Sequence, residues 1–194
     1  MFTGLIRELG VLTRLRHGAG TLQLEVDAPR LSRQVAPTDS VAVNGVCLTV
    51  TGVRRGRVSF DVIPETRART ALSRLRPGDR VHLEPSLTLA DRLNGHIMLG
   101  HVDGVGRVVR RLKRPGMLVV TIQADAAVRR WLVPKGPVAV DGVSLTVGPT
   151  IRRGRFMVFL IPETLRRTTL GDRRVGDLFN LEADYVAKLI RARG

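Results

Sequence analysis

The chain has 194 residues, of which 43% are hydrophobic and 25% charged, with one cysteine and a formal net charge of +15. A single cysteine excludes an intrachain disulfide and a zinc cluster, and no apolar run could span a bilayer, so we expect a soluble cytoplasmic protein. The charge is mostly scattered arginine, and aromatic residues, at 4%, are too few to stack single-stranded nucleic acid. We interpret the positive charge as a solvated basic surface without a nucleic-acid partner. Anionic small molecules and adventitious nucleic-acid binding remain alternatives.

An internal repeat organises the chain. The block VAVNGVCLTV from Val41 returns as VAVDGVSLTV from Val138, an offset of 138 − 41 = 97. Ile-Pro-Glu-Thr at 63–66 returns at 161–164 with an offset of 98, so one residue is gained between the two motifs. Such a duplication predicts two similar domains, which we place at 1–97 and 98–194.

The first half reads as short strands separated by turns. We expect a strand from Met1 to Leu12 broken near Gly10, a hairpin over 41–50 that turns at Asn44-Gly45, and further strands over 21–26, 58–63 and 80–84. A helix is predicted from Glu65 to Leu75, entered through Thr66. Short strands with one helix predict a small antiparallel barrel.

The second half repeats this pattern after a linker over 87–97. We expect strands over 118–122 and 156–161 and a helix over 163–170. Residues 184–190 have apolar side chains at helical spacing, and Asp184 suits the N-cap of such a helix. We expect this helix to pack against other subunits, with folding back on its own barrel as the alternative. The predicted fold class is all-β, with two tandem six-stranded antiparallel barrels, short helices and a C-terminal helix.

Equivalent polar positions in the two halves are the candidate sites, because a duplication implies two similar pockets or one site built from both. Cys47 aligns with Ser144. Taken alone, Cys47 suits a small buried residue, and Ser144 lacks the G-x-S-x-G elbow of hydrolases. The odd spacing of His96 and His101 would put them on opposite faces of an extended segment, so no shared metal ion is expected. There is also no glycine-rich dinucleotide or phosphate loop.

Ordered motifs across the chain resemble riboflavin synthase of the alpha-chain type: the start MFTG, the blocks NGVCLTV and DGVSLTV, the linker GHIMLGHVDG, and both Pro-Glu-Thr turns. The resemblance implies two Greek-key barrels and a homotrimer held partly by a helix over 184–194. It implies a dismutation of two 6,7-dimethyl-8-ribityllumazine molecules to riboflavin and 5-amino-6-ribitylamino-2,4-pyrimidinedione, the final step of riboflavin biosynthesis. Neither cofactor nor metal is expected, and association with lumazine synthase is a further expectation.

The resemblance also implies an active site between the N-terminal barrel of one subunit and the C-terminal barrel of its neighbour. It makes Cys47, His101, Ser144 and Asp184 the catalytic candidates, and Phe2 and Thr3 a cover for the bound ring. The first pocket is expected to contain Gly4, Leu5, Ile6, Ser40, Cys47, Leu48, Thr49, Asp61, Val62, Ile63, Pro64, Glu65 and Thr66. The second is expected to contain Gly100, His101, Val102, Lys135, Ser144, Leu145, Thr146, Phe159, Leu160, Ile161, Pro162, Glu163 and Thr164.

Two other functions are compatible with the sequence. One is an antenna protein that binds lumazine or flavin without turnover, and the other is a basic β-barrel protein that binds RNA. The presence of all four catalytic candidates favours the enzyme.

Overall fold

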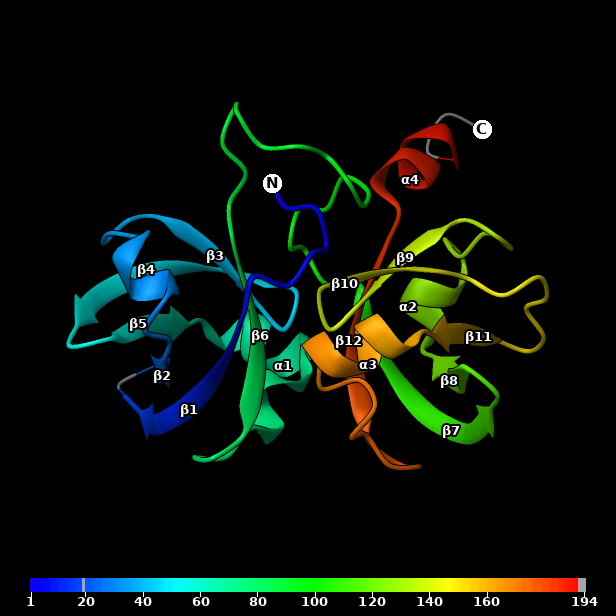
Figure 1. Ribbon diagram of the computed structural model, residues 1–194, viewed down its shortest axis with the longest axis horizontal. Coiled ribbons are helices and arrows are strands. Elements are labelled where there is room, and N and C mark those ends of the chain that lie inside the picture. Colours follow the sequence, from blue (N-terminus) through cyan, green and yellow to red (C-terminus); the bar gives the residue numbers. More distant parts are fainter. Residues whose placement is uncertain (19, 192–194) are drawn as a thin grey trace.

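The computed structural model describes residues 1–18 and 20–191, and its strands form two six-stranded antiparallel sheets that lie side by side (Figure 1). The first half contains β1 (Glu8–His17), β2 (Leu22–Asp27), the 3-10 helix η1 (Leu31–Arg33), β3 (Ser40–Val43), β4 (Val46–Arg54), β5 (Arg57–Val62), α1 (Pro64–Arg69), the 3-10 helix η2 (Ala71–Arg74) and β6 (Arg80–Pro85). The second half contains β7 (Gly104–Arg114), β8 (Met117–Ala124), α2 (Ala126–Arg129), β9 (Pro137–Val140), β10 (Val143–Thr146), β11 (Arg155–Leu160), α3 (Pro162–Arg167), β12 (Leu178–Ala183) and α4 (Tyr185–Arg191). The predicted all-β fold class is confirmed.

The first sheet closes into a barrel in the order β1-β2-β5-β4-β3-β6, in which β6 pairs again with β1. Strands β3, β4 and β5 follow one another through short turns, and β6 returns to lie beside β3, which is a Greek-key connection. The predicted turn between β3 and β4 is present. Asn44 and Gly45 form it at φ values of 46° and 78°, which is the backbone conformation that this residue pair favours.

The second sheet has the same strand order, β10-β9-β12-β7-β8-β11, but its two outer strands do not form a ladder with each other. Strand β10 ends at Thr146, and only the N–H of Gly148 continues toward β11, where it donates to the carbonyl of Met157 at 2.7 Å. The next residue is Pro149, which has no N–H to donate and restricts the residue before it, so the pairing stops there. The residue gained between the repeats falls in this segment.

The predicted strands are present within a few residues of their expected ends, with one correction at the beginning of the chain. The strand expected from Met1 and broken near Gly10 instead begins at Glu8 and runs through Gly10. The backbone of Gly10 pairs there with Val81 of β6. Residues before Glu8 extend from the first barrel toward the second half. Strand patterns in the sequence could not predict this crossing.

The helix predicted from Glu65 to Leu75 is also corrected, because it is two short helices rather than one. It begins at Pro64, not at Thr66. Proline is favourable at the first helical position because its missing N–H would have no intrahelical partner. Thr70 interrupts the helix in an extended conformation, and its hydroxyl accepts from the N–H of Leu72 to begin η2.

Each half buries its own apolar core. The segment at the start of each half, however, packs against the core of the other half. Ile6 packs against the core of the second half, and Val102 packs against the core of the first. Between the halves lies a small cluster that contains Phe2, Ala42, Met98 and Ala139. The backbones of Phe2 and Met98 are joined by two hydrogen bonds of 2.8 and 3.1 Å. The exchanged segments therefore tie the halves together about an approximate twofold axis.

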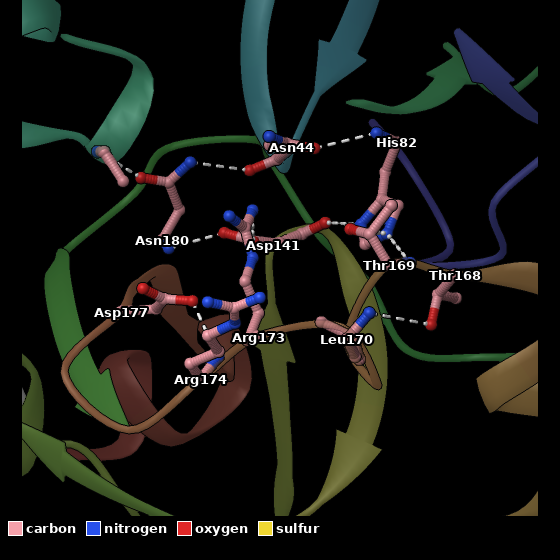
Figure 2. Close-up of polar contacts among 11 residues, drawn as sticks. Asn44, His82, Asp141, Thr168, Thr169, Leu170, Arg173, Arg174, Asp177 and Asn180 are labelled. Carbon is pink, nitrogen blue, oxygen red and sulfur yellow. Dashed lines mark hydrogen bonds and ion pairs between the residues drawn. The ribbon is translucent and has the colours of Figure 1, made fainter. Parts of the chain in front are cut away.

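A buried polar network joins the two halves at this axis (Figure 2). The side-chain oxygen of Asn44 accepts from the N–H of His82, and that of Asp141 accepts from the N–H of Asn180, both at 2.7 Å. The halves differ in charge here, because Asp141 forms an ion pair with Arg173 at 3.0 Å. Burial raises the pKa of Asp141 to about 6, while Arg173 acts in the opposite direction.

The asymmetric ion pair gives a stability prediction. Asp141→Asn is expected to lower the free energy of unfolding by about 2 kcal/mol, because it leaves a partly buried arginine without its counterion. Adding Arg173→Leu should recover most of this loss, since the first half has Asn44 and Leu75 at the corresponding positions. Urea unfolding of the single and double variants measures the coupling. Additive losses would show that Asp141 and Arg173 do not stabilise each other.

Helix α4 is attached to its own half but keeps an apolar face open. The ammonium of Lys188 donates to both carboxylate oxygens of Asp103 at 2.7 and 2.8 Å. Leu189 and Ile190 remain 49% and 70% exposed. The helix therefore folds onto its own half and still presents a surface to other molecules. Within the part of the chain that the structure describes, no helix is long and apolar enough to cross a bilayer.

Candidate active site

The second half has a hollow of about 440 Å³ beside Ser144, a volume within the range of roughly 300–1,000 Å³ that is usual for small-molecule pockets. Strand β10 supplies one wall, α3 supplies a second, and the N-terminal segment crosses from the first half to supply a third. The hollow is lined by Gly4, Leu5, Ile6, Arg7, Arg30, Val143, Ser144, Glu163, Thr164, Arg167 and Thr168. Six predicted site residues, Gly4, Leu5, Ile6, Ser144, Glu163 and Thr164, therefore meet here.

Ser144 is hydrogen-bonded to a histidine that sequence reasoning did not select. Its hydroxyl lies 2.7 Å from Nδ1 of His96, and the main-chain N–H of His96 donates to the carbonyl of Thr3 at 3.2 Å. Nε2 of His96 is buried and has no hydrogen-bond partner among the described residues. Burial lowers the pKa of His96, and attraction by Asp184 opposes this in part. A neutral imidazole can take a proton from the hydroxyl or from a bound ligand.

Two buried glutamates fix the crossing segments. Glu84 accepts from the N–H groups of Thr3 and Gly4 at 2.7 and 3.0 Å, and Glu182 accepts from those of Leu99 and Gly100 at 2.8 and 3.0 Å. Burial raises the pKa of both carboxyl groups, in Glu182 to about 7, although these N–H donors favour the charged form. The two glutamates therefore perform the same task in the two halves.

The crossing changes which residues share a pocket. The carbonyl of Gly4 accepts from the N–H of Ser144, and the carbonyl of Gly100 accepts from that of Cys47, both at 2.9 Å. We expected residues 4–6 in the first-barrel pocket and 100–102 in the second. This grouping is wrong, because 4–6 lie against the second half and 100–102 against the first. A side chain would not fit at either glycine, because a Cβ atom there would lie 2.6 Å from the Cβ of the residue opposite.

Several predicted contact residues are interior to the fold. Phe2 and Thr3 are fully buried, Phe2 between the halves and Thr3 with its hydroxyl on Glu84 at 2.7 Å, so the expectation that they cover a bound ring is corrected. Leu48, Val62 and Leu160 belong to the barrel cores. The side chains of these three residues are therefore not available to a ligand.

The remaining predicted residues lie apart from the Ser144 hollow. Ser40 pairs with Thr49 across β3 and β4 and lines a separate hollow of about 510 Å³. Asp61 lines a third, of about 220 Å³. Exposed positions are Ile63, Pro64, Glu65, His101, Lys135, Thr146, Phe159, Ile161 and Pro162, whereas Thr66, Val102, Leu145 and Asp184 are half-buried. Ile63 and Ile161 are equivalent and each 54% exposed, so the apolar residues before α1 and α3 face outward in both halves.

The arrangement supports acid–base chemistry on a small molecule. No group of three histidine, cysteine, aspartate or glutamate side chains gathers as a metal site within residues 1–18 and 20–191. The charged side chains around the hollow are Arg7, Arg30, Glu163 and Arg167, and the Ser144–His96 pair is its reactive feature.

Known proteins match this chain along nearly its whole length. A model of the lumazine binding domain matches residues 3–86 and again residues 99–184. Riboflavin synthase of Mycobacterium bovis is 44% identical over 98% of this chain and 96% of that protein. Riboflavin synthase of Bacillus subtilis is 34% identical over 97% of this chain and 87% of that protein. The chain belongs to the riboflavin synthase family.

Solved structures show that other proteins have the same fold. LumP complexed with riboflavin has a TM-score of 0.87 and 22% identity, covering 94% of this chain and 99% of that one. LumP complexed with 6,7-dimethyl-8-(1'-D-ribityl) lumazine has a TM-score of 0.85 and 21% identity over the same shares. The double domain match also agrees with the internal duplication of this riboflavin synthase family member.

Sequence reasoning missed His96, Glu84 and Glu182. The two glutamates occupy equivalent positions near the ends of β6 and β12, on the strand faces opposite the core residues Leu83 and Leu181, and the crossing segments cover those faces. Strand alternation alone does not show that such an outer face will be covered. His96 belongs to the linker motif GHIMLGHVDG, but sequence reasoning considered it only as a possible metal ligand. It lies in an irregular linker, and only the folded chain brings it to Ser144.

Proposed function

We propose that the protein is a riboflavin synthase that converts two molecules of 6,7-dimethyl-8-ribityllumazine into riboflavin and 5-amino-6-ribitylamino-2,4-pyrimidinedione. The two products together contain all the atoms of the two substrates, so the reaction needs no external oxidant, reductant or cofactor. The observation that carries the proposal is the hollow at Ser144, where a serine–histidine pair meets a segment exchanged from the other half.

The internal symmetry supports a reaction between two identical substrates. Each half has the same construction, in which a crossing segment is held by a glutamate and bonded to Ser144 or Cys47. We propose that residues 1–97 and 98–194 each bind one lumazine. Holding two reactants in a fixed relation lowers the barrier by up to about 7–11 kcal/mol.

The polar residues receive distinct roles in this proposal. His96 takes the proton of Ser144 or of the methyl group that must be deprotonated, and Asp184 stabilises the resulting imidazolium. Cys47 is the counterpart of Ser144. His101 is exposed and follows Gly100, whose carbonyl accepts from the N–H of Cys47. The predicted binding residues other than Phe2 and Thr3, from Gly4 to Thr164, stay a proposal, with main-chain contacts assigned to those in the cores.

We propose that the working site forms between the first barrel of one subunit and the second barrel of its neighbour in a homotrimer. Ile63, Phe159 and Ile161 support this, because these apolar side chains near the proposed pockets stay exposed in one chain. The proposed setting is the cytoplasm, with lumazine synthase as a further partner and without a nucleic acid or membrane partner.

The open face of α4 gives an assembly prediction. Ile190→Glu is expected to dissociate the trimer into monomers at micromolar concentration, because it places a charge in an apolar contact between subunits. Light scattering after size-exclusion chromatography measures the mass. Val175→Glu is the matched control, since Val175 is 61% exposed on a loop away from α4. If Ile190→Glu leaves the mass unchanged, the helix is not the trimer contact.

The decisive experiment mixes the purified protein with 6,7-dimethyl-8-ribityllumazine and no cofactor, and follows the visible spectrum. Riboflavin appearing at half the rate of lumazine loss is the expected result. A shifted lumazine spectrum without turnover would instead identify an antenna or carrier protein. No spectral change at all would reopen the RNA-binding alternative, which also predicts a steep dependence of RNA affinity on salt.

A further inference from the structure

His82 lies outside the proposed active site, yet it connects the first half to the second. It sits in β6 with its side chain fully buried and points across the approximate twofold axis (Figure 2). Its Nδ1 lies 2.7 Å from the carbonyl oxygen of Asp141, and its Nε2 accepts from the N–H of Thr169 at 2.8 Å. Because Nε2 accepts, Nδ1 must be the nitrogen that carries the proton and donates to Asp141.

The two groups that His82 holds belong to two different walls of the Ser144 hollow. Asp141 begins the turn into β10, which carries Ser144 three residues later. Thr169 follows Thr168, which lines the hollow and ends α3 by donating from its hydroxyl to the carbonyl of Thr164 at 2.6 Å. A single imidazole from the first half therefore spans both walls.

The first half has the same bridge, made by an amide. Asn180 of β12 donates from Nδ2 to the carbonyl of Asn44 at 2.9 Å, and its Oδ1 accepts from the N–H of Ala71 at 2.7 Å. Ala71 follows Thr70, which ends α1 as Thr168 ends α3. The two halves thus hold each other through equivalent side chains, His82 and Asn180, each of which we call a brace. Only the His82 brace can be protonated.

We propose that His82 is a positioning residue for the Ser144 hollow, whose neutral imidazole fixes β10 relative to the end of α3, so that protonation releases this wall in the second half alone. The inference rests on the proposed function in one respect, because it takes the hollow to be a substrate site. Asn180 performs the same task for the first half without titrating.

The surroundings favour the neutral imidazole. Burial, helped by the nearby charges of Arg173 and Arg80, lowers the pKa of His82 to about 4, although the hydrogen bond to the Asp141 carbonyl and the charge of Asp172 act to raise it. The unfolded chain binds this proton near pH 6.5 and the folded chain only near pH 4. The stabilisation from the neutral brace is therefore complete above pH 6.5 and is lost as the pH falls toward 4.

The first test compares His82→Ala with His82→Asn, which copies the brace of the other half. We expect His82→Ala to lower kcat/KM for riboflavin formation by about a hundredfold, because the walls of the hollow shift. His82→Asn should restore activity close to that of the wild type. Equal kinetics of the two variants would overturn the proposal.

The second test measures the hydrogen bonds of His82 through amide exchange in the wild-type protein. It therefore does not depend on whether His82→Ala folds. Amide exchange at Thr169 should lose about tenfold in protection factor per pH unit as wild-type protein approaches pH 4, because the released fraction is the protonated one. In His82→Asn this protection should not depend on pH, and Asn180→Ala should expose the amide of Ala71 instead. A protection factor at Thr169 that is independent of pH in the wild type would overturn the proposal.

Failure of the proposed function would be distinguishable from failure of this inference. If the wild type forms no riboflavin from lumazine, the proposed function fails, while Thr169 exchange still tests the brace. Riboflavin affinity, followed by flavin fluorescence, then replaces turnover as the test of the hollow. Equal affinity in His82→Ala and His82→Asn would overturn the positioning role.

Discussion

Replacing Ser144 with alanine is expected to lower kcat for riboflavin formation by about 10²–10³-fold while lumazine binding changes little. The hydroxyl is hydrogen-bonded to His96 at 2.7 Å and lines the hollow, so its removal takes away a proton-transfer group but leaves the walls in place. Steady-state kinetics and equilibrium binding of lumazine measure the two effects separately. An equal loss of turnover and binding would return Ser144 to a purely structural role.

The histidine partner provides the matched comparison. His96→Ala is expected to lower kcat to a similar extent, and the double variant should be no slower than the slower single variant, because residues that act as a unit are not additive. Multiplicative losses would show that Ser144 and His96 act independently. His101→Ala should also lower turnover, so the two variants test His96 and His101 separately.

Replacing Gly45 with alanine is expected to lower the free energy of unfolding by about 3–4 kcal/mol, the largest stability effect we predict for a single methyl group. Gly45 and Gly142 lie in the two hairpin turns that meet at the twofold axis. A Cβ atom at Gly45 would lie 2.6 Å from the backbone nitrogen of Gly142, which cannot move away as a flexible side chain would. Gly142→Ala should cost a similar amount for the reciprocal reason.

Gly78→Ala is the control that separates strain from contact. Gly78 also has a positive φ, 96° against 78° for Gly45, but a Cβ atom there would meet nothing within 4 Å. Its cost should be limited to backbone strain, about 1 kcal/mol. Urea unfolding curves give both values. If Gly45→Ala costs no more than Gly78→Ala, the turns do not restrain each other.

Local patterns were sufficient for most of the fold. The repeat predicted two similar sheets, Asn44-Gly45 predicted the hairpin, and alternating residues located most strands, because these features depend on near neighbours in the chain. Helix ends were less accurate: Pro64 begins a helix where the pattern placed only the end of a strand, and Thr70 divides the expected helix in two. Both depend on main-chain hydrogen bonds that periodicity does not record.

The candidate site was predictable only as a set of residues, not as an arrangement. The resemblance to a known family selected Ser144, Gly4 and Glu163, which the structure brings to one hollow. The residues carried over from that resemblance grouped Gly4 with the wrong half, because a duplicated sequence suggests that each half keeps its own segments. The crossing of 4–6 and 100–102 is a contact between distant residues and has no local signature.

By itself, the sequence determined that this protein is duplicated, built from short strands, and similar to a family that makes riboflavin. Its tertiary structure decided which groups meet: His96 with Ser144, Glu84 with Gly4, and His82 with the walls of the opposite hollow. The physical reason is that burial and hydrogen-bond geometry are properties of the folded chain, where residues 48 to 87 positions apart come within 3 Å. No periodicity in the chain encodes such distances.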